Sequence, residues 1–290
     1  MNPSPEKSGL PPMRCMEIRG GNRAIEEAFQ TPGFDAWAYS LPYENSVSGG
    51  DLHYVSVCGA GLITRLIVAD VSGHGEEVAD FSESLHSLMW KNINTKSQTR
   101  LVEALNRQFG MRAQSLRFAT AVVATYLASN RTLTVCNAGH PRPLWHHADS
   151  GEWGLLAQEV AGKCNLPLGL DDDSPYHQFT VLLAPGDVLL FYTDALTEAM
   201  DRDGRVLGEE GLLAIARSID LSEPHRIAPT LIEAVGRHRS GRPADDDLTL
   251  IILFHNGRGP RRWSLASRLD VYAKLLGIRG SKPVPRPDAG

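Results

Sequence analysis

Residues 62–93 read LITRLIVADVSGHGEEVADFSESLHSLMWKNI and contain both kinds of secondary structure expected in this chain. Residues 62–69 form an apolar run of the length of a buried strand, and apolar side chains recur at helical spacing from residue 76 to residue 93. Asp70 and a glycine-containing loop, residues 71–75, separate the two segments. The stretch therefore predicts a strand that ends at an aspartate, then a loop, then a helix.

The sequence on either side adds more strands and more helices. We expect further strands at residues 53–57, 119–128, 132–136, 181–183, 188–192 and 248–254, and further helices at residues 99–108, 208–218 and 226–238. Asn130 lies between two of these strands and suits the turn of a hairpin. Hairpin-linked strands with helix pairs inserted between them favour antiparallel sheets covered by helices, an α+β layered fold. The strict alternation of strand and helix that a doubly wound parallel sheet requires is absent from this pattern.

The chain has 290 residues, enough for one large domain. Prolines among polar residues predict a flexible N-terminal tail over residues 1–13. Residues 14–256 contain no low-complexity linker, charge block or repeat, and we expect them to form a single domain. Residues 257–290 are expected to form a C-terminal extension with one short helix, at residues 264–276, and a disordered end.

Composition narrows the class of protein. Hydrophobic residues make up 42% and charged residues 22% of the chain, as in soluble globular proteins. No apolar run approaches the roughly 20 residues needed to cross a bilayer, and a net charge of −5 gives no reason to expect nucleic-acid binding. The four cysteines are far apart and form no CxxC pair, and no secretory signal is present. They predict buried, reduced thiols in a cytoplasmic protein, and not a zinc site: Cys15, Cys58, Cys136 and Cys164.

Four aspartates each lie at an end of a predicted strand: Asp51, Asp70, Asp194 and Asp246. A carboxylate beside a buried apolar strand is costly unless another charge compensates it. Hard divalent cations do so through oxygen ligands, and two cations need several carboxylates from separate segments. Glycines near Asp51 and Asp70 allow the backbone to approach a ligand closely. Any single one of these aspartates could be a turn former or helix cap, but all four together favour a metal site.

The aspartates lie within short motifs that follow one another along the chain. The motifs are Gly49-Gly50-Asp51, Ala69-Asp70-Val71-Ser72-Gly73-His74-Gly75, Phe118-Ala119-Thr120, Asn137-Ala138-Gly139-His140-Pro141, Pro167-Leu168-Gly169, Tyr192-Thr193-Asp194 and Asp246-Asp247-Leu248-Thr249. In this order they closely resemble the PPM-type (type 2C) phosphatases, in the branch of stage II sporulation protein E and RsbU. Each motif alone is a weak signal, whereas the ordered set, which covers residues 33–254, is highly specific.

The resemblance implies a β-sandwich of two mainly antiparallel sheets flanked by helices. It implies that one Mn²⁺ or Mg²⁺ is bound by Asp51, Asp70 and the backbone carbonyl of Val71. A second ion would be bound by Asp70, Asp194 and Asp246, so that Asp70 bridges the two. Two cations about 3.5–4 Å apart activate a water for in-line attack on phosphorus, without a covalent protein intermediate.

The resemblance also implies a substrate and a mode of control. The substrate would be phosphoserine or phosphothreonine on a regulatory protein, such as an anti-sigma-factor antagonist. Relatives are switched through helices equivalent to residues 76–108, so we expect a separate activating protein to raise a low basal activity. A helix pair that only covers the sheet, beside an always-active site, remains the alternative.

Two positions depart from the family pattern. Tyr54 stands where many relatives have a second acidic residue near the first metal, and Ala195 stands where they have glycine. Neither removes a predicted ligand. We expect His74 and His140 to order their loops and not to act in catalysis. Two further polar runs are expected to be exposed: His146-His147 on a hairpin and Asp171-Asp172-Asp173 in a loop.

A catalytically weak or silent phosphatase-fold regulator that acts by binding a protein is the alternative function. The presence of all four predicted ligands argues against it. Gly49-Gly50-Asp51 is also reminiscent of cyclic-dinucleotide cyclases, but Leu52 and His53 do not continue that motif. Metal-dependent release of phosphate separates the enzyme from the silent regulator.

Overall fold

The computed structural model describes residues 9–58, 61–71, 76–94, 97–112, 118–157 and 165–259. The strands in these residues are β1 (Glu17–Gly21), β2 (Ile25–Thr31), β3 (Phe34–Leu41), β4 (Asp51–Cys58), β5 (Ile63–Val71), β6 (Ala119–Leu127), β7 (Thr132–Ala138), β8 (Leu144–His147), β9 (Glu152–Leu155), β10 (Phe179–Leu182), β11 (Val188–Tyr192) and β12 (Leu248–His255). The α-helices are α1 (Glu76–Lys91), α2 (Gln98–Arg112), α3 (Gly208–Ala216) and α4 (Ile227–His238), and the short 3₁₀ helices are η1 (Tyr43–Asn45), η2 (Asp194–Leu196) and η3 (Pro224–Arg226).

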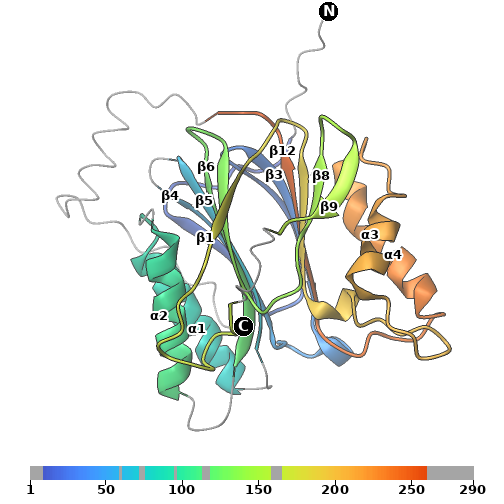
Figure 1. Cartoon of the computed structure of the whole chain (residues 1–290), viewed down its shortest axis with the longest axis horizontal. Coiled ribbons are helices and arrows are strands. Elements are labelled where there is room, and N and C mark those ends of the chain that lie inside the picture. The colour runs from blue at the N-terminus through green and yellow to red at the C-terminus, as the bar shows by residue number, and fades with distance from the viewer. Residues whose placement is uncertain are drawn as a thin grey trace, which may run out of the picture.

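The strands form two six-stranded sheets packed face to face (Figure 1). The first sheet has the order β1-β4-β5-β6-β7-β10, and the second has the order β2-β3-β12-β11-β8-β9. Neighbouring strands are antiparallel in both sheets. The α+β sandwich of antiparallel sheets flanked by helices is therefore confirmed.

Each sheet has two apolar faces, because one faces the other sheet and one faces helices. In β5, Leu66 and Val68 lie in the core between the sheets, whereas Ile67 and Ala69 lie in the core beneath α1 and α2. Successive side chains of a strand point to opposite faces. This is why residues 62–69 read as a continuous apolar run and not as an alternating one.

The helices lie in pairs on the two outer faces, as Figure 1 shows. Phe81 of α1 and Phe109 of α2 join that pair through rings whose centroids are 3.7 Å apart. On the second sheet, Leu212 of α3 and Leu231 of α4 are fully buried in a separate outer core. Burial of one such leucine contributes about 1.5–3 kcal/mol. No helix of the described residues is long and apolar enough to cross a membrane.

The N-terminal part of the chain differs from the expectation. Met13 is buried in the core between the sheets, and its backbone N–H donates to the carbonyl oxygen of Gln30 at 2.8 Å. Packing therefore begins before residue 14, and the strands β1, β2 and β3 follow where no strand was predicted. The expected helix at residues 264–276 lies outside the described residues.

Three of the four cysteines lie within the described residues, and Cys164 lies outside them. Cys58 and Cys136 are buried free thiols, and Cys15 is a half-buried free thiol.

Candidate metal centre

The four predicted aspartates come from strand ends that lie at the same end of the sandwich. Asp51 begins β4 and pairs directly with Asp70 near the end of β5. Asp194 follows β11 and Asp246 precedes β12, and these two strands are antiparallel neighbours in the second sheet. Each sheet thus contributes two of the four carboxylates.

Asp51 and Asp70 point into the space between the sheets. They alternate along their strands with Leu52 and Ala69, which lie in the core beneath α1 and α2. Asp51 is buried, with 4% of its surface exposed. A buried threonine of the second sheet, Thr193, donates its hydroxyl to Asp51 Oδ2 at 2.7 Å and so connects the two sheets at this end.

The carboxylates raise one another's pKa. Burial, followed by the charges of Asp194 and Asp246, raises the pKa of Asp70 to about 7. Burial and then Glu198 raise the pKa of Asp194. Burial also raises the pKa of Asp51 well above its ordinary value, although the hydrogen bond from Thr193 opposes this shift. Carboxylates affect one another in this way only when they are close, so the site concentrates negative charge in a largely buried place.

The donor set fits a hard divalent cation, because it consists of carboxylate oxygens and the nearby carbonyl of Val71. Asp194 is half-buried and Asp246 is exposed, so the group opens to solvent on that side. Among the described residues, no three His, Cys, Asp or Glu side chains are already grouped in a metal-binding arrangement. The aspartates thus converge on one end of the sandwich without forming a closed ligand shell.

Asp247 ties the start of β12 to the segment before Asp51. Its Oδ1 accepts a hydrogen bond from the backbone N–H of Tyr43 at 2.6 Å, and its Oδ2 accepts one from the N–H of Gly50 at 2.5 Å. A side chain on Gly49 would place its Cβ 2.5 Å from the Asp247 carboxylate. The glycine is needed at this position because the carboxylate lies against its backbone.

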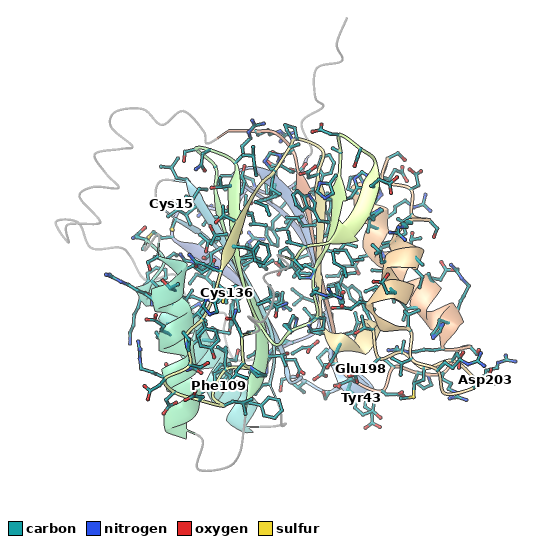
Figure 2. All side chains as sticks on the ribbon, viewed as in Figure 1. Cys15, Tyr43, Phe109, Cys136, Glu198 and Asp203 are labelled. Atoms are coloured by element: carbon teal, nitrogen blue, oxygen red, sulfur yellow. The ribbon has the colours of Figure 1, made fainter. Side chains whose placement is uncertain are left out.

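Two residues that sequence reasoning missed surround Asp194. Arg239, buried at the end of α4, donates from its guanidinium to the carbonyl oxygen of Ala195. The N–H of Glu198 donates to the carbonyl oxygen of Asp194 at 2.7 Å, and Figure 2 shows Glu198 and Tyr43 at this end of the sandwich. Ala195, the departure from glycine, is buried within η2 and leaves the predicted ligand in place.

The other departure, Tyr54, lies away from the aspartates. Its side chain is in the core beneath α1, where its hydroxyl group contacts Ser82 Oγ at 2.7 Å and donates to the Ser82 carbonyl oxygen at 3.0 Å. Position 54 is three residues after Asp51 and so lies on the opposite face of β4. Tyr54 connects the sheet to α1.

His140 orders its turn, as the sequence suggested. Its Nδ1 is 2.9 Å from Thr120 Oγ1, and its backbone N–H donates to Asn137 Oδ1 at 2.8 Å. Burial lowers the pKa of His140 to about 4, so the ring is neutral at pH 7.

His146 and His147 are half-buried in β8, with His147 stacked on Trp145, and the expectation of an exposed pair is wrong. The Asp171-Asp172-Asp173 loop is exposed as expected, and His74 lies outside the described residues.

Solved structures share this fold. The RsbU and RsbW domains of Rv1364c from Mycobacterium tuberculosis are 25% identical, with a TM-score of 0.64, over 88% of this chain and 70% of that one. The PP2C phosphatase domain of SpoIIE from Bacillus subtilis, with a fragment of its regulatory domain, is 17% identical, with a TM-score of 0.63, over 82% of this chain and 71% of that one. RsbX, solved in complex with magnesium, is 20% identical, with a TM-score of 0.56, over 79% of this chain and 98% of that one.

Curated relatives agree with the structural likeness. Phosphoserine phosphatase RsbU of Bacillus subtilis is 24% identical over 229 residues, which span 77% of this chain and 64% of that protein. Phosphoserine phosphatase RsbP of the same organism is 27% identical over 138 residues, which span 46% of this chain and 33% of that protein. The chain thus spans less than two thirds of either relative. Residues 63–256 match the Stage II sporulation protein E (SpoIIE) family, and the chain therefore belongs to that family.

Proposed function

We propose that this chain is a metal-dependent protein serine/threonine phosphatase that hydrolyses phosphoserine or phosphothreonine on a regulatory protein. The observation that carries the proposal is the gathering of Asp51, Asp70, Asp194 and Asp246 at one end of the sandwich, with pKa values of the first three raised by burial and by neighbouring carboxylates. Such a group is costly unless cations occupy it. The family assignment supports the same reading.

The ligand roles are those that the resemblance to the family implies, and the placement of the four aspartates at one end of the sandwich supports them. Asp51, Asp70 and the carbonyl of Val71 would hold one ion, and Asp70, Asp194 and Asp246 would hold a second. Two Mn²⁺ or Mg²⁺ ions in such a site neutralise phosphate oxygens and lower the pKa of a bound water toward neutrality.

The surrounding residues position these ligands. Thr193 donates its hydroxyl to one oxygen of Asp51 and so fixes the orientation of this carboxylate. Asp247 holds Gly50, next to Asp51, through the backbone. Arg239 holds the carbonyl of Ala195, next to Asp194. Three of the four ligands are therefore buried or half-buried on rigid strand ends, which limits the reorganisation needed at reaction.

The substrate proposal rests on the relatives. RsbU and RsbP are both named phosphoserine phosphatases, and a solved relative combines RsbU and RsbW domains. We propose an anti-sigma-factor antagonist, phosphorylated on serine or threonine, as the substrate of this chain. The exposed position of Asp246 leaves the site open enough for a phosphorylated loop of another protein.

A separate activating protein would act through α1 and α2. Tyr54 lies in β4, three residues after Asp51, and contacts Ser82 in α1. A shift of α1 therefore reaches the strand that carries a ligand. A partner that favours the metal-competent arrangement would raise a low basal activity.

Phosphate release from phosphorylated candidate antagonists tests the proposal, with Mn²⁺, with Mg²⁺ and with EDTA. We expect turnover with either ion and none with the chelator. Direct binding of Mn²⁺, measured by calorimetry, shows whether the metal sites are filled in the assay. Phosphate release then separates the enzyme from the alternative, a silent regulator that binds its protein partner and releases no phosphate. Absence of turnover in spite of saturated metal sites, with and without a partner, would contradict the enzyme.

A further inference from the structure

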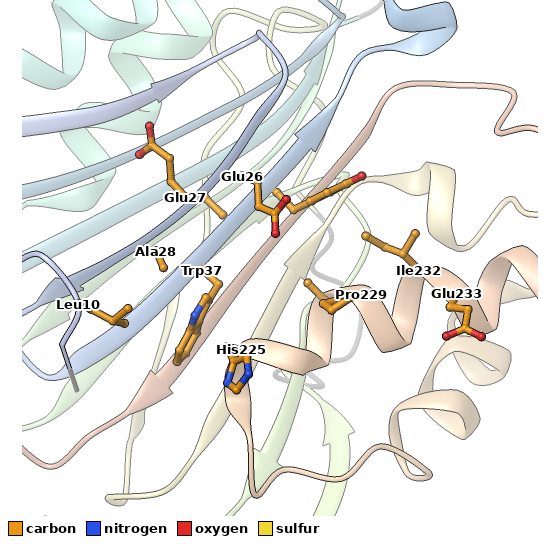
Figure 3. A pocket seen from close by; sticks show the side chains of 12 residues that line it. Leu10, Glu26, Glu27, Ala28, Trp37, His225, Pro229, Ile232 and Glu233 are labelled. Carbon is orange, nitrogen blue, oxygen red and sulfur yellow. The ribbon is translucent and has the colours of Figure 1, made fainter. Parts of the chain in front are cut away.

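A groove lies on the outer face of the second sheet, away from the aspartates. It has a volume of about 740 Å³ and separates β2 and β3 from α4 (Figure 3). Its lining is mainly apolar, with Ala28, Trp37 and Tyr39 from the strands and Ala228, Pro229 and Ile232 from α4. Trp37, Tyr39 and Ile232 are only partly buried against the core beneath the helices. The helix pair thus leaves the β2 side of this sheet face uncovered.

The rim of the groove is acidic. Glu26 from β2 and Glu233 from α4 line it on opposite sides. Glu233 pairs with Arg237 at 2.6 Å, whereas Glu26 has no ion-pair partner in the part of the chain that the structure describes. Glu27 alternates with Glu26 along β2, so its side chain faces the first sheet, where it lies 3.7 Å from Arg19 of β1 and adds no charge to the rim. An occupant of this groove therefore needs an apolar stripe with a cation at its border.

We propose that the C-terminal segment of this chain, residues 264–276, docks in the groove as an amphipathic helix. Its apolar residues recur at helical spacing and form one stripe: Leu265, Leu269, Tyr272 and Leu276. Arg268 lies at the border of that stripe on a helix, and Lys274 lies on the opposite side. Residues 260–276 contain four basic side chains and one acidic side chain, Asp270, so their charge complements the rim.

The segment can reach the groove. β12 ends at His255, which pairs with Phe34, and the chain continues to Gly259 beside Gln30 and Thr31. Five extended residues, from Gly259 to Ser264, span about 17 Å. The strand from Thr31 back to Glu26 covers about 16 Å. The linker therefore matches the length of β2 that leads to the groove.

Tethering favours this occupant over other candidates. A segment joined by a short linker is present at an effective concentration of roughly millimolar, which a separate protein or a second copy must exceed. The N-terminal residues 1–8, MNPSPEKS, carry no apolar stripe. The docked segment covers Trp37 and Ile232, two of the side chains that α3 and α4 leave partly exposed.

Hydrogen–deuterium exchange on the full-length chain tests the proposal. Leu269→Asp is expected to raise amide exchange about tenfold in β2 and at the start of α4, whereas the matched variant Lys274→Asp, on the other side of the stripe, leaves exchange unchanged. Glu26→Lys is expected to raise exchange at the same peptides, and Arg268→Glu in the same chain to restore protection. This charge exchange does not depend on the folding of the Leu269→Asp variant.

Each result of the exchange measurements either supports or overturns docking of residues 264–276 in the groove. Protection that is independent of protein concentration, in a chain that light scattering shows to be a monomer, supports docking in the same molecule. Protection that appears only with dimer formation overturns the proposal in favour of a second copy. Unchanged exchange in both Leu269→Asp and Glu26→Lys overturns it as well. The readout is exchange and not phosphate release, so the result is independent of the proposed enzymatic function.

Discussion

The two ends of the space between the sheets solve the problem of buried polar groups in opposite ways. At one end, Asp51 and Asp70 bring negative charge into a largely buried place. At the other end, the ring of His255 meets the hydroxyl group of Tyr126 at 2.8 Å, and Phe34 packs edge-on against both rings. Burial lowers the pKa of His255, so the ring is uncharged at pH 7. One end holds a neutral, hydrogen-bonded pair of side chains, and the other holds the carboxylates of the proposed metal site.

The two ends of this core are therefore expected to contribute differently to stability and to activity. A neutral hydrogen bond between buried side chains contributes about 1 kcal/mol and costs nothing when a ligand leaves. Crowded carboxylates destabilise a protein without metal, and in the proposed metal site they supply the affinity for cations. Substitutions at the two ends should therefore change different measurements.

The largest effect is expected for Asp70→Asn at the acidic end. Loss of the proposed bridging carboxylate should lower metal-dependent phosphate release by roughly 1,000-fold or more, which corresponds to about 4 kcal/mol in transition-state free energy. Asp245→Asn is the matched control, because Asp245 is exposed and lies outside the proposed ligand set. Wild-type turnover of the Asp70 variant at saturating Mn²⁺ would show that Asp70 is not a ligand.

The run of three aspartates at the start of β12 gives a graded series. Asp246→Ala should abolish turnover, and Asp245→Ala should have a mild effect. Asp247→Ala should lower turnover by about 10–100-fold, because it releases the N–H groups of Tyr43 and Gly50 and so loosens the segment before Asp51. Initial rates with a phosphopeptide at several Mn²⁺ concentrations measure this order. Equal losses at Asp245 and Asp246 would mean that the ligand is assigned to the wrong position.

A smaller effect is expected for the pH dependence of stability without metal. The pKa of Asp70 is about 7 in the folded chain and 3.8 ordinarily, so the folded state binds a proton that the unfolded state has released between these values. The free energy of unfolding in EDTA should therefore fall by about 1–3 kcal/mol as pH rises from 4 to 7. Asp70→Asn should reduce this loss and raise the melting temperature at pH 8. Denaturant titrations across the pH range would contradict the expectation if both proteins changed in parallel.

The smallest effect on activity is expected at the end of the core that holds Tyr126 and His255. Tyr126→Phe leaves a ring nitrogen of His255 without its partner and should lower the free energy of unfolding by about 1–3 kcal/mol. Turnover and Mn²⁺ affinity should not change at a temperature where the variant is folded. A loss of metal affinity in this variant would show that the two ends are coupled.

The sequence predicted the parts of the fold that depend on local pattern. The strand at residues 62–69 and the helix after it are present because their apolar spacing reports which faces are buried. The strands β1, β2 and β3 were missed. β2 is an edge strand with exposed Glu26 and Glu27, so its apolar signal is weak. Periodicity also says nothing about neighbours, and the placement of β12 beside β3 could not be inferred from it.

The same limit applies to the site. The positions of the four aspartates at strand ends were visible in the sequence, because a charge beside an apolar run stands out. The hydrogen bond from Thr193 to Asp51 joins the two sheets, and the contact of Arg239 with Ala195 joins the end of α4 to η2. Such contacts link residues distant in sequence and depend on how the layers pack. Thr193 lies in the Tyr192-Thr193-Asp194 motif, and this was the signal available in the sequence.

The position of β12 in the second sheet has a consequence for folding during synthesis on the ribosome. This strand is the last along the described chain, yet it lies inside the second sheet, between β3 and β11. At 5–20 residues per second, translation needs roughly 10–40 s to pass from β3 to the end of β12. During that interval β3 lacks a neighbour on one side, while β4, β5, β6 and β7 can pair in order of synthesis. The nascent chain thus carries an open strand edge that is exposed to wrong pairing, and ribosome-arrested chains ending before and after residue 255 should differ in protease resistance.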